Sequence, residues 1–202
     1  MSVLTARPMP RALVGVALLV LVPTVEAVAQ SAQKYALQFS ALTTTIKGTG
    51  GSGIGGWGVE PQLRFNRLYT SETAGVVSLG VGVQRTSHSS GGDNITITGV
   101  FAEPRWVPNT SSPKIFPYLA GRLGVLQQSN NFGSSSGSLA VGAGAGIAVK
   151  LSRTVNVDGG LALVNQKFGN IRLSNGQAAE FVRFTTYAAK LGVSVGFPSR
   201  AR

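Results

Sequence analysis

The segment TSHSSGGDN, around the only histidine of the chain, His88, is the first place where residue types could support catalysis. Ser87, Ser89, Ser90 and Asp93 accompany it, and serine, histidine and a carboxylate are the components of a nucleophilic triad. A triad must be held rigidly, and a segment with two adjacent glycines is a poor scaffold for that geometry. We therefore expect a solvated loop histidine and no catalytic residues. An enzyme would need His88 next to a serine and a carboxylate.

Other patterns that could bind a cofactor or a metal are weak. The stretch GTGGSGIGGWG, from Gly48 to Gly58, is similar to a phosphate-binding loop. It lacks the Lys-Ser/Thr pair of such a loop and no helix is predicted after it, so a flexible extracellular loop is the better interpretation. The chain contains no cysteine, which excludes disulfides and thiolate metal ligands. The carboxylates show no metal-binding spacing, and we expect neither a cofactor nor a metal.

The elements that position the remaining polar residues are strands, and the last one, from Glu180 to Phe197, shows the pattern most simply. One parity carries Tyr187, Ala189, Leu191, Val193, Val195 and Phe197, and the other carries Ala188, Lys190, Gly192, Ser194 and Gly196. Successive side chains of a strand point to opposite faces. The segment is therefore predicted to be a strand with one apolar face and one small or polar face.

The same unit, an alternating segment followed by a turn, repeats about eight times along the chain. The segments cover roughly residues 34–46, 56–69, 73–85, 94–107, 114–127, 138–152, 154–167 and 180–197. They are long enough to cross a bilayer as tilted strands, and none shows convincing helical periodicity. Longer connections rich in glycine, serine or asparagine alternate with shorter ones. This alternation predicts long loops outside the cell and both termini in the periplasm.

The fourth segment departs from this pattern at its end. We expect Ile95, Ile97, Gly99 and Phe101 to face outward, like the apolar parity of the other segments. The residues Glu103-Pro104-Arg105-Trp106 then break the alternation. Proline cannot donate a hydrogen bond to a ladder, so a β-bulge or a frayed strand end is expected there.

The choice between a soluble and a membrane barrel depends on which parity faces inward. In a soluble lipocalin-type barrel or a sandwich, the large apolar side chains would fill the interior and the other parity would face water. Here the other parity is mostly glycine, alanine and serine, and charged residues make up only 12% of the chain. Small residues suit the narrow lumen of an eight-stranded barrel. The sequence therefore predicts an all-β fold, an eight-stranded antiparallel up-and-down transmembrane β-barrel.

Long polar side chains on the small-residue parities are predicted to meet in the lumen. The charged members of this lumenal polar network are Glu60, Arg64, Arg122, Lys150, Asp158 and Lys190. Buried charges need partners, so Glu60 and Asp158 are each expected to contact at least one of the four cations. We interpret these charges as groups that fill the lumen rather than as a transport site.

The N-terminal segment predicts export. Arg7 and Arg11 precede an apolar stretch of about eleven residues, and Ala27-Val28-Ala29 is a small-x-small cleavage site. The stretch is too short for a membrane-spanning helix, and the pattern is typical of a cleaved secretory signal peptide. The predicted division is a signal peptide over residues 1–29, an outer-membrane barrel over 30–197 and a short periplasmic tail over 198–202.

The end of the last segment carries a resemblance to a known family. Lys190, Gly192, Val195 and Phe197 fit the pattern polar-x-Gly-x-x-apolar-x-aromatic. This pattern resembles the C-terminal signal that the barrel assembly machinery of the bacterial outer membrane recognises. Together with the topology, it makes the chain similar to the family of eight-stranded outer-membrane barrels that includes OmpA-type, OmpX-type and OmpW-type barrel domains. Members of that family often end on the aromatic residue, whereas five residues follow Phe197 here.

The resemblance implies an integral outer-membrane protein of a Gram-negative bacterium. Its implied partners are outer-membrane lipids, lipopolysaccharide and the barrel assembly machinery. The formal net charge is +11, but Lys and Arg are scattered without a run, so nucleic acid is not an expected partner. We expect a non-enzymatic structural or surface-interaction role through the extracellular loops. The alternatives are a small porin-like channel for ions or small solutes and, less favoured, an outer-leaflet lipid-modifying enzyme.

Overall fold

A computed structural model describes residues 33–48, 53–90, 93–131, 135–168, 170–172, 178–180 and 184–197. The strands are β1 (Tyr35–Gly48), β2 (Ile54–Ser71), β3 (Gly75–Ser90), β4 (Asp93–Val107), β5 (Ile115–Asn130), β6 (Ser135–Lys150), β7 (Val155–Gln166), β8 (Asn170–Arg172), β9 (Ala178–Glu180) and β10 (Phe184–Phe197). Within the described ranges, no helix is long and apolar enough to cross a membrane. The predicted signal peptide and the predicted tail over residues 198–202 lie outside the described residues.

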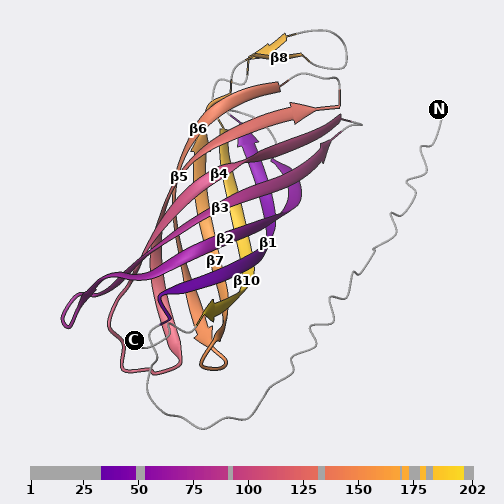
Figure 1. Cartoon of the computed structure of the whole chain (residues 1–202). Coiled ribbons are helices and arrows are strands. Elements are labelled where there is room, and N and C mark those ends of the chain that lie inside the picture. Colours follow the sequence, from indigo (N-terminus) through magenta and orange to yellow (C-terminus); the bar gives the residue numbers. More distant parts are fainter. Residues whose placement is uncertain are drawn as a thin grey trace, which may run out of the picture.

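Eight of these strands close into one barrel (Figure 1). Their order around the barrel is β1, β10, β7, β6, β5, β4, β3, β2, and the neighbouring strands are antiparallel. β1 closes the barrel against β10, from Tyr35 opposite Phe197 to Gly48 opposite Phe184. The predicted eight-stranded antiparallel barrel is thus confirmed. We call the end that holds Tyr35 and Phe197 the terminus end and the opposite end the loop end.

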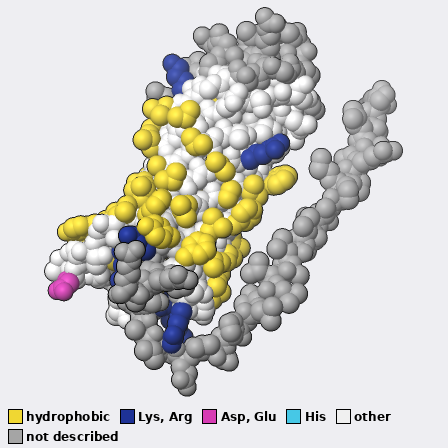
Figure 2. All heavy atoms as spheres, viewed as in Figure 1, with side chains coloured by type: hydrophobic (Ala, Val, Ile, Leu, Met, Phe, Trp, Pro, Cys, Tyr) yellow, Lys and Arg dark blue, Asp and Glu magenta, His cyan; other side chains and the backbone are white. Residues whose placement is uncertain are grey.

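Side chains alternate between the exterior and the interior of the barrel, as the glycine-rich strand β6 shows. Val141 and Ile147 are 53% and 51% exposed, whereas Glu60 on β2 is 0% exposed and lies inside. A Cβ placed on Gly142 would press against the inward side chain of Val164, so this glycine lines the bore. Figure 2 shows the outward apolar side chains gathered over the barrel wall. Large apolar residues therefore face out and the small residues face in.

Several strands extend further toward the loop end than the alternation of apolar residues predicts. β3 continues to Ser90 and β5 to Asn130, where threonine, serine, glutamine and asparagine replace the large apolar side chains. β2 begins at Ile54, so part of the glycine-rich stretch predicted as a loop is a strand. The predicted connection after the seventh segment contains the hairpin formed by β8 and β9.

β4 contradicts two expectations. Ile97 and Phe101 are only 1% and 3% exposed and face the bore. The predicted outward orientation of their parity, which includes Ile95 and Gly99, is therefore wrong. Pro104 keeps its place in an unshifted register against β3, so the predicted bulge or frayed end is also wrong. The pairing with β5 is interrupted only at Glu103 and Pro104 and resumes at Arg105 in the same register, so the missing N–H of the proline costs no more than a local gap in the ladder.

A register shift does occur in β2, between Phe65 and Tyr69 at the terminus end of the barrel. Arg67 lies within this bulge and has a φ of 55°, in the left-handed region. A residue other than glycine adopts that conformation at a cost of about 1 kcal/mol or more. The surrounding ladder therefore holds the Arg67 backbone in an unfavourable conformation.

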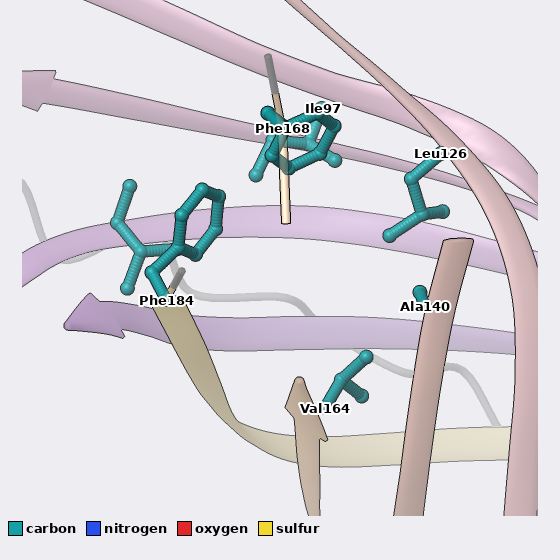
Figure 3. Close-up of a cluster of buried hydrophobic side chains, with 7 residues drawn as sticks. Ile97, Leu126, Ala140, Val164, Phe168 and Phe184 are labelled. Carbon is teal, nitrogen blue, oxygen red and sulfur yellow. The ribbon is translucent and has the colours of Figure 1, made fainter. Parts of the chain in front are cut away.

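The interior contains a cluster of apolar side chains at the loop end and a group of charged side chains beyond it. Figure 3 shows the apolar cluster. We call it the apolar cap, and its buried members are Ile46, Ile97, Leu126, Ala140, Val164, Phe168 and Phe184. The rings of Phe168 and Phe184 stack with their centroids 5.2 Å apart. These side chains fill much of the loop end of the bore, where they lie beside the buried polar residues His88, Gln128 and Gln166. All the charged residues of the network described below lie in the middle and toward the terminus end.

Candidate functional site

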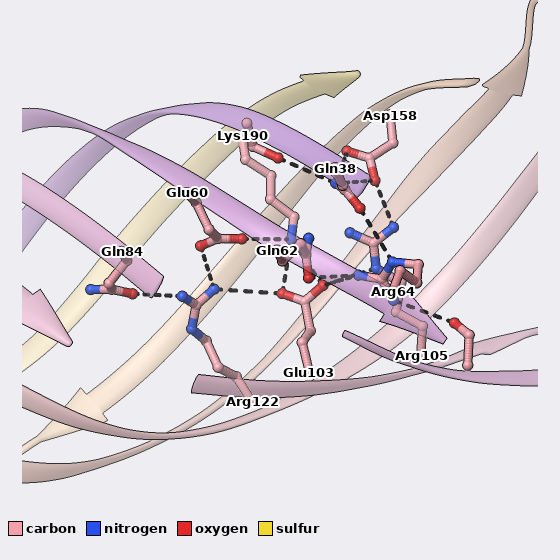
Figure 4. Close-up of polar contacts among 12 residues, drawn as sticks. Gln38, Glu60, Gln62, Arg64, Gln84, Glu103, Arg105, Arg122, Asp158 and Lys190 are labelled. Atoms are coloured by element: carbon pink, nitrogen blue, oxygen red, sulfur yellow. Dashed lines mark hydrogen bonds and ion pairs between the residues drawn. The ribbon is translucent and has the colours of Figure 1, made fainter. Parts of the chain in front are cut away.

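Glu103 on β4 is the centre of a charged network in the middle of the barrel (Figure 4). Its carboxylate oxygens lie 3.0 Å from Arg64 Nη2, 2.9 Å from Arg105 Nε, 3.5 Å from Arg122 Nη1 and 2.9 Å from Lys190 Nζ. Glu103 is 2% exposed, so cations from four strands surround one buried carboxylate. We call the network the charged plug, and its charged members are Glu60, Arg64, Glu103, Arg105, Arg122, Asp158 and Lys190.

Glycines in the intervening strands allow the charges to meet. Arg64 on β2 lies opposite Gly80 on β3, and Gly80 lies opposite Glu103 on β4. A Cβ on Gly80 would lie 3.0 Å from Arg64 Nη2, so the missing side chain leaves the guanidinium its path across β3. The small-residue parity thus provides the space in which long side chains from flanking strands interlock.

Glu60 forms the second ion-pair site of the plug. Its Oε2 lies 2.7 Å from Arg122 Nη1, and its Oε1 lies 3.7 Å from Lys190 Nζ. Arg122 also donates through Nη2 to Gln84 Oε1 at 2.5 Å. Arg122 and Lys190 therefore connect the carboxylate of Glu60 with that of Glu103.

Asp158 on β7 forms the third site, toward the terminus end. Its Oδ2 accepts a hydrogen bond from Arg105 Nη1 at 2.6 Å. Gln38 Nε2 donates to both Asp158 oxygens, at 3.0 and 2.8 Å, while Gln38 Oε1 accepts from Arg64 Nε at 3.2 Å. Gln38 therefore satisfies a carboxylate and a guanidinium that do not pair with each other directly.

The plug contains four cations and three carboxylates, so its formal charge is 4 − 3 = +1. Two of the guanidiniums also lie over aromatic rings, Arg105 at 4.1 Å from the Tyr118 centroid and Arg122 at 3.7 Å from that of Phe101. Removing charges from water is costly, and the ion pairs and ring contacts offset part of that cost. Deleting a single partner would leave an uncompensated buried charge. The arrangement is suited to holding the bore closed.

The structure brings together most of the residues predicted for this network: Glu60, Arg64, Arg122, Asp158 and Lys190. Asp158 does not contact any of the four predicted cations, however, because its ion-pair partner is Arg105. Lys150 lies apart from the plug, half-buried at the terminus end. Among the described residues, no carboxylate lies within salt-bridge distance of Lys150.

Sequence reasoning missed Glu103 and Arg105, although they are central to the plug. Both lie on the parity of Phe101, which was assigned to the exterior because it carries large apolar residues earlier in β4. The alternation itself contained a signal: Glu103 and Arg105 are two residues apart and share a face. Two charges on one face of a membrane strand indicate that this face is the interior.

His88 is a buried residue of β3 rather than a solvated loop residue. It is 1% exposed, and its Nε2 lies 2.9 Å from Thr44 Oγ1 inside the barrel. Ser87 and Ser89 belong to the opposite parity of β3 and so point away from it. The side chains of Ser90 and Asp93 lie outside the described residues. The described part of this segment therefore shows no serine that His88 could activate.

A small cavity separates the charged plug from the apolar cap. It measures about 30 Å³, roughly the share of one water molecule in the liquid. Glu60, Arg122 and Lys190 line it on one side, and Ile97, Leu126 and Val164 line it on the other. An ion would have to displace both layers of side chains to pass along the axis.

The residues of the predicted assembly signal lie on both faces of β10. Lys190 and Gly192 face the bore, where Lys190 pairs with Glu103. Val195 and Phe197 are 45% and 50% exposed on the exterior. Recognition by an assembly machinery stays a prediction for these four residues.

A closed antiparallel barrel with an apolar exterior and a bore filled by charged side chains defines a class, the eight-stranded transmembrane β-barrels. No protein-family model matches the sequence, and no curated protein matches it.

Among solved structures, the chain is similar to Neisserial surface protein A, with a TM-score of 0.60 and 18% identity over 81% of this chain and 97% of that one. Two other matches have TM-scores below 0.5. Ail of Yersinia pestis has a TM-score of 0.45 and 11% identity over 81% of this chain and 97% of its own. The N-terminal β-barrel domain of OprF from Pseudomonas aeruginosa has 0.42 and 14% over 80% and 97%. The first likeness establishes the fold, that of the eight-stranded outer-membrane barrels.

Proposed function

We propose that the protein is an integral β-barrel of a Gram-negative outer membrane that acts through its surface and loops and catalyses no reaction. The observation that carries the proposal is the filled bore. The charged plug and the apolar cap follow one another along the axis, and the cavity between them measures only about 30 Å³. Because the charged plug and the apolar cap both close the bore, the surfaces left for interaction are the exterior of the barrel and its two ends.

The exterior supports placement in a lipid bilayer. Large apolar side chains are exposed all around the wall, among them Leu161, Leu191 and Val125 at 68%, 65% and 60%. Soluble proteins rarely expose such a continuous apolar surface. Exposed aromatic residues lie toward both ends, such as Trp57 at the loop end and Trp106 at the terminus end, as in the interfacial girdles of membrane barrels.

The proposal extends to export, orientation and partners. A cleaved signal peptide over residues 1–29 would direct export, and the assembly machinery would recognise β10. The terminus end would face the periplasm and the loop end the outside of the cell, where lipopolysaccharide would surround the barrel. The shared fold with Neisserial surface protein A supports this placement by analogy.

Conductance of the refolded protein in a planar bilayer tests the closed bore against the porin-like alternative. We expect no unitary current steps, because the plug and the cap leave no continuous water path. Folded protein should be verified beforehand by its β-sheet circular dichroism, and detergent buffer alone is the blank. Reproducible current steps from the folded protein would contradict the closed bore and favour the porin-like channel.

Cysteine labelling tests the orientation, because the chain contains no cysteine of its own. Gly48→Cys places a thiol at the loop end, where a new side chain meets open space. Ser111→Cys places one in the exposed turn after β4, at the terminus end. A membrane-impermeant maleimide added to intact cells should label Gly48→Cys alone, and lysis should make Ser111→Cys reactive. The reverse pattern would invert the proposed orientation.

A further inference from the structure

The terminus end of the bore opens into a chamber that the charged plug does not fill. Its volume is about 260 Å³, room for roughly nine waters at about 30 Å³ each. The chamber has a strongly basic lining, and we call it the basic vestibule. Its charged lining residues are Arg64, Arg67, Arg105, Lys150, Arg153 and Asp158.

Carboxylates of the described residues neutralise the charge of the vestibule only in part. Arg153 has interactions of its own and is left out of the sum. The other four cations and one carboxylate give 4 − 1 = +3. Glu103 lies behind Arg64 and Arg105 at 3.0 and 2.9 Å and reduces this sum to +2. Lys150 has no described carboxylate within salt-bridge distance. A concave site with walls of one sign focuses the field and attracts ions of the opposite sign.

The backbone at Arg67 is a second, independent indication. Arg67 lies in the β2 bulge with a φ of 55°, a conformation that glycine would adopt without cost. The unfavourable conformation places this arginine at the vestibule. Strain held at a lining residue points to a role that depends on its side chain.

We propose that the basic vestibule binds a small, multiply charged oxyanion, a phosphate or diphosphate group. The guanidinium groups match the oxygens of such a group in pairs, and the Lys150 ammonium adds a point charge. The volume is below that of most sites for drug-sized ligands, which favours a small ion or one charged group of a larger molecule. Anion binding at the vestibule requires neither the proposed orientation in the membrane nor a closed bore. The binding site and the closed bore can therefore be disproved separately.

Pyrophosphate is the probe, titrated by calorimetry into the refolded full chain in an uncharged detergent at constant ionic strength. We expect saturable binding that Lys150→Gln weakens about tenfold, the effect of one charge-assisted contact. Lys34→Gln is the matched control. It removes the same charge at the same end, but Lys34 lies on the exterior over the Tyr35 ring, 5.7 Å from its centroid. If both variants weakened pyrophosphate binding equally, the effect would come from the net charge of the protein, and the proposed site would be wrong.

Arg67→Gly separates binding from folding. Glycine relieves the φ of 55°, so the ligand-free barrel should be at least as stable as the wild type in urea, while pyrophosphate affinity falls about tenfold. Unchanged affinity would remove Arg67 from the site and contradict the argument from strain.

A second arm distinguishes a soluble anion from a lipid headgroup. The protein is incubated with phosphatidylglycerol and examined by native mass spectrometry. A lipid adduct that Lys150→Gln abolishes, without pyrophosphate binding, would assign the site to a lipid phosphate. Adducts that are equal in the wild type and in Lys150→Gln, without pyrophosphate binding, would overturn the proposal.

Discussion

The two halves of the bore are filled by opposite kinds of interaction. The apolar cap consists of aliphatic and aromatic side chains whose burial is non-directional and tolerates single losses gradually. The charged plug consists of groups that each depend on a partner, with Glu103 shared among four cations. One narrow lumen can therefore be closed in two ways, and the two closures should respond differently to mutation.

The largest effect is expected from Glu103→Gln. The substitution keeps the shape but leaves four buried cations against two carboxylates, 4 − 2 = +2. We expect a loss of about 3–5 kcal/mol in the free energy of unfolding, measured by urea titration of the refolded barrel. Glu72→Gln, in the exposed turn after β2, is the control and should change little. A loss for Glu103→Gln below about 1 kcal/mol would show that the plug is not held together by this carboxylate.

Leu126→Ala tests the other half. Leu126 is 2% exposed within the apolar cap, and its truncation should cost about 3 kcal/mol through lost burial and a new cavity. Leu161→Ala changes the same side chain on the exterior, where it is 68% exposed, and should cost much less in the same urea experiment. Equal losses would mean that the cap is not tightly packed.

A double-mutant cycle tests whether the charged plug and the apolar cap contribute to stability independently. Arg64→Met alone removes a cation from Glu103, whereas Arg64→Met with Glu103→Gln leaves 3 − 2 = +1, the original balance. We expect a coupling of about 2 kcal/mol between these two residues and below about 0.5 kcal/mol between Glu103 and Leu126. Strong coupling of Glu103 with Leu126 would instead join the plug and the cap into one cooperative unit.

The smallest effect is expected from Thr44→Val, which removes the hydrogen-bond partner of His88 while keeping the shape of the side chain. A loss of about 1 kcal/mol should result, because His88 Nε2 is then left buried without Thr44 Oγ1. Diethyl pyrocarbonate reactivity of His88 in the folded wild type should be low. Rapid modification together with an unchanged stability would restore the solvated histidine that the sequence suggested.

Much of the fold could be predicted from the sequence because large apolar residues alternate with small ones, and β6 shows why. Val141 and Ile147 can face only lipid or a wide core, and Gly142 and Gly146 suit only a crowded bore. In β4 this contrast is lost, because Phe101 faces in while Val100, also large and apolar, is 56% exposed. Which parity faces inward is then decided by the pairing with β3 and β5, information that one strand does not contain.

The charged plug could be predicted only in part, for the same reason. Lys190 and Asp158 lie among small residues whose inward orientation is clear, whereas Glu103 and Arg105 follow the ambiguous part of β4. The apolar cap was not predicted, because Ile46 and Leu126 share their parities with polar residues nearer the middle. Its members belong to different strands and meet only when the barrel closes.

The position of Lys190 has a consequence for the order of biogenesis. It belongs to β10, the strand that completes the seam against β1, and it contributes the ammonium nearest to Glu103 Oε2. A chain still lacking β10 has unpaired edges on β1 and β7, and Glu103 and Glu60 lack one of their cations. The ion pairs of Glu103 and Glu60 are therefore completed in the same event that closes the barrel wall.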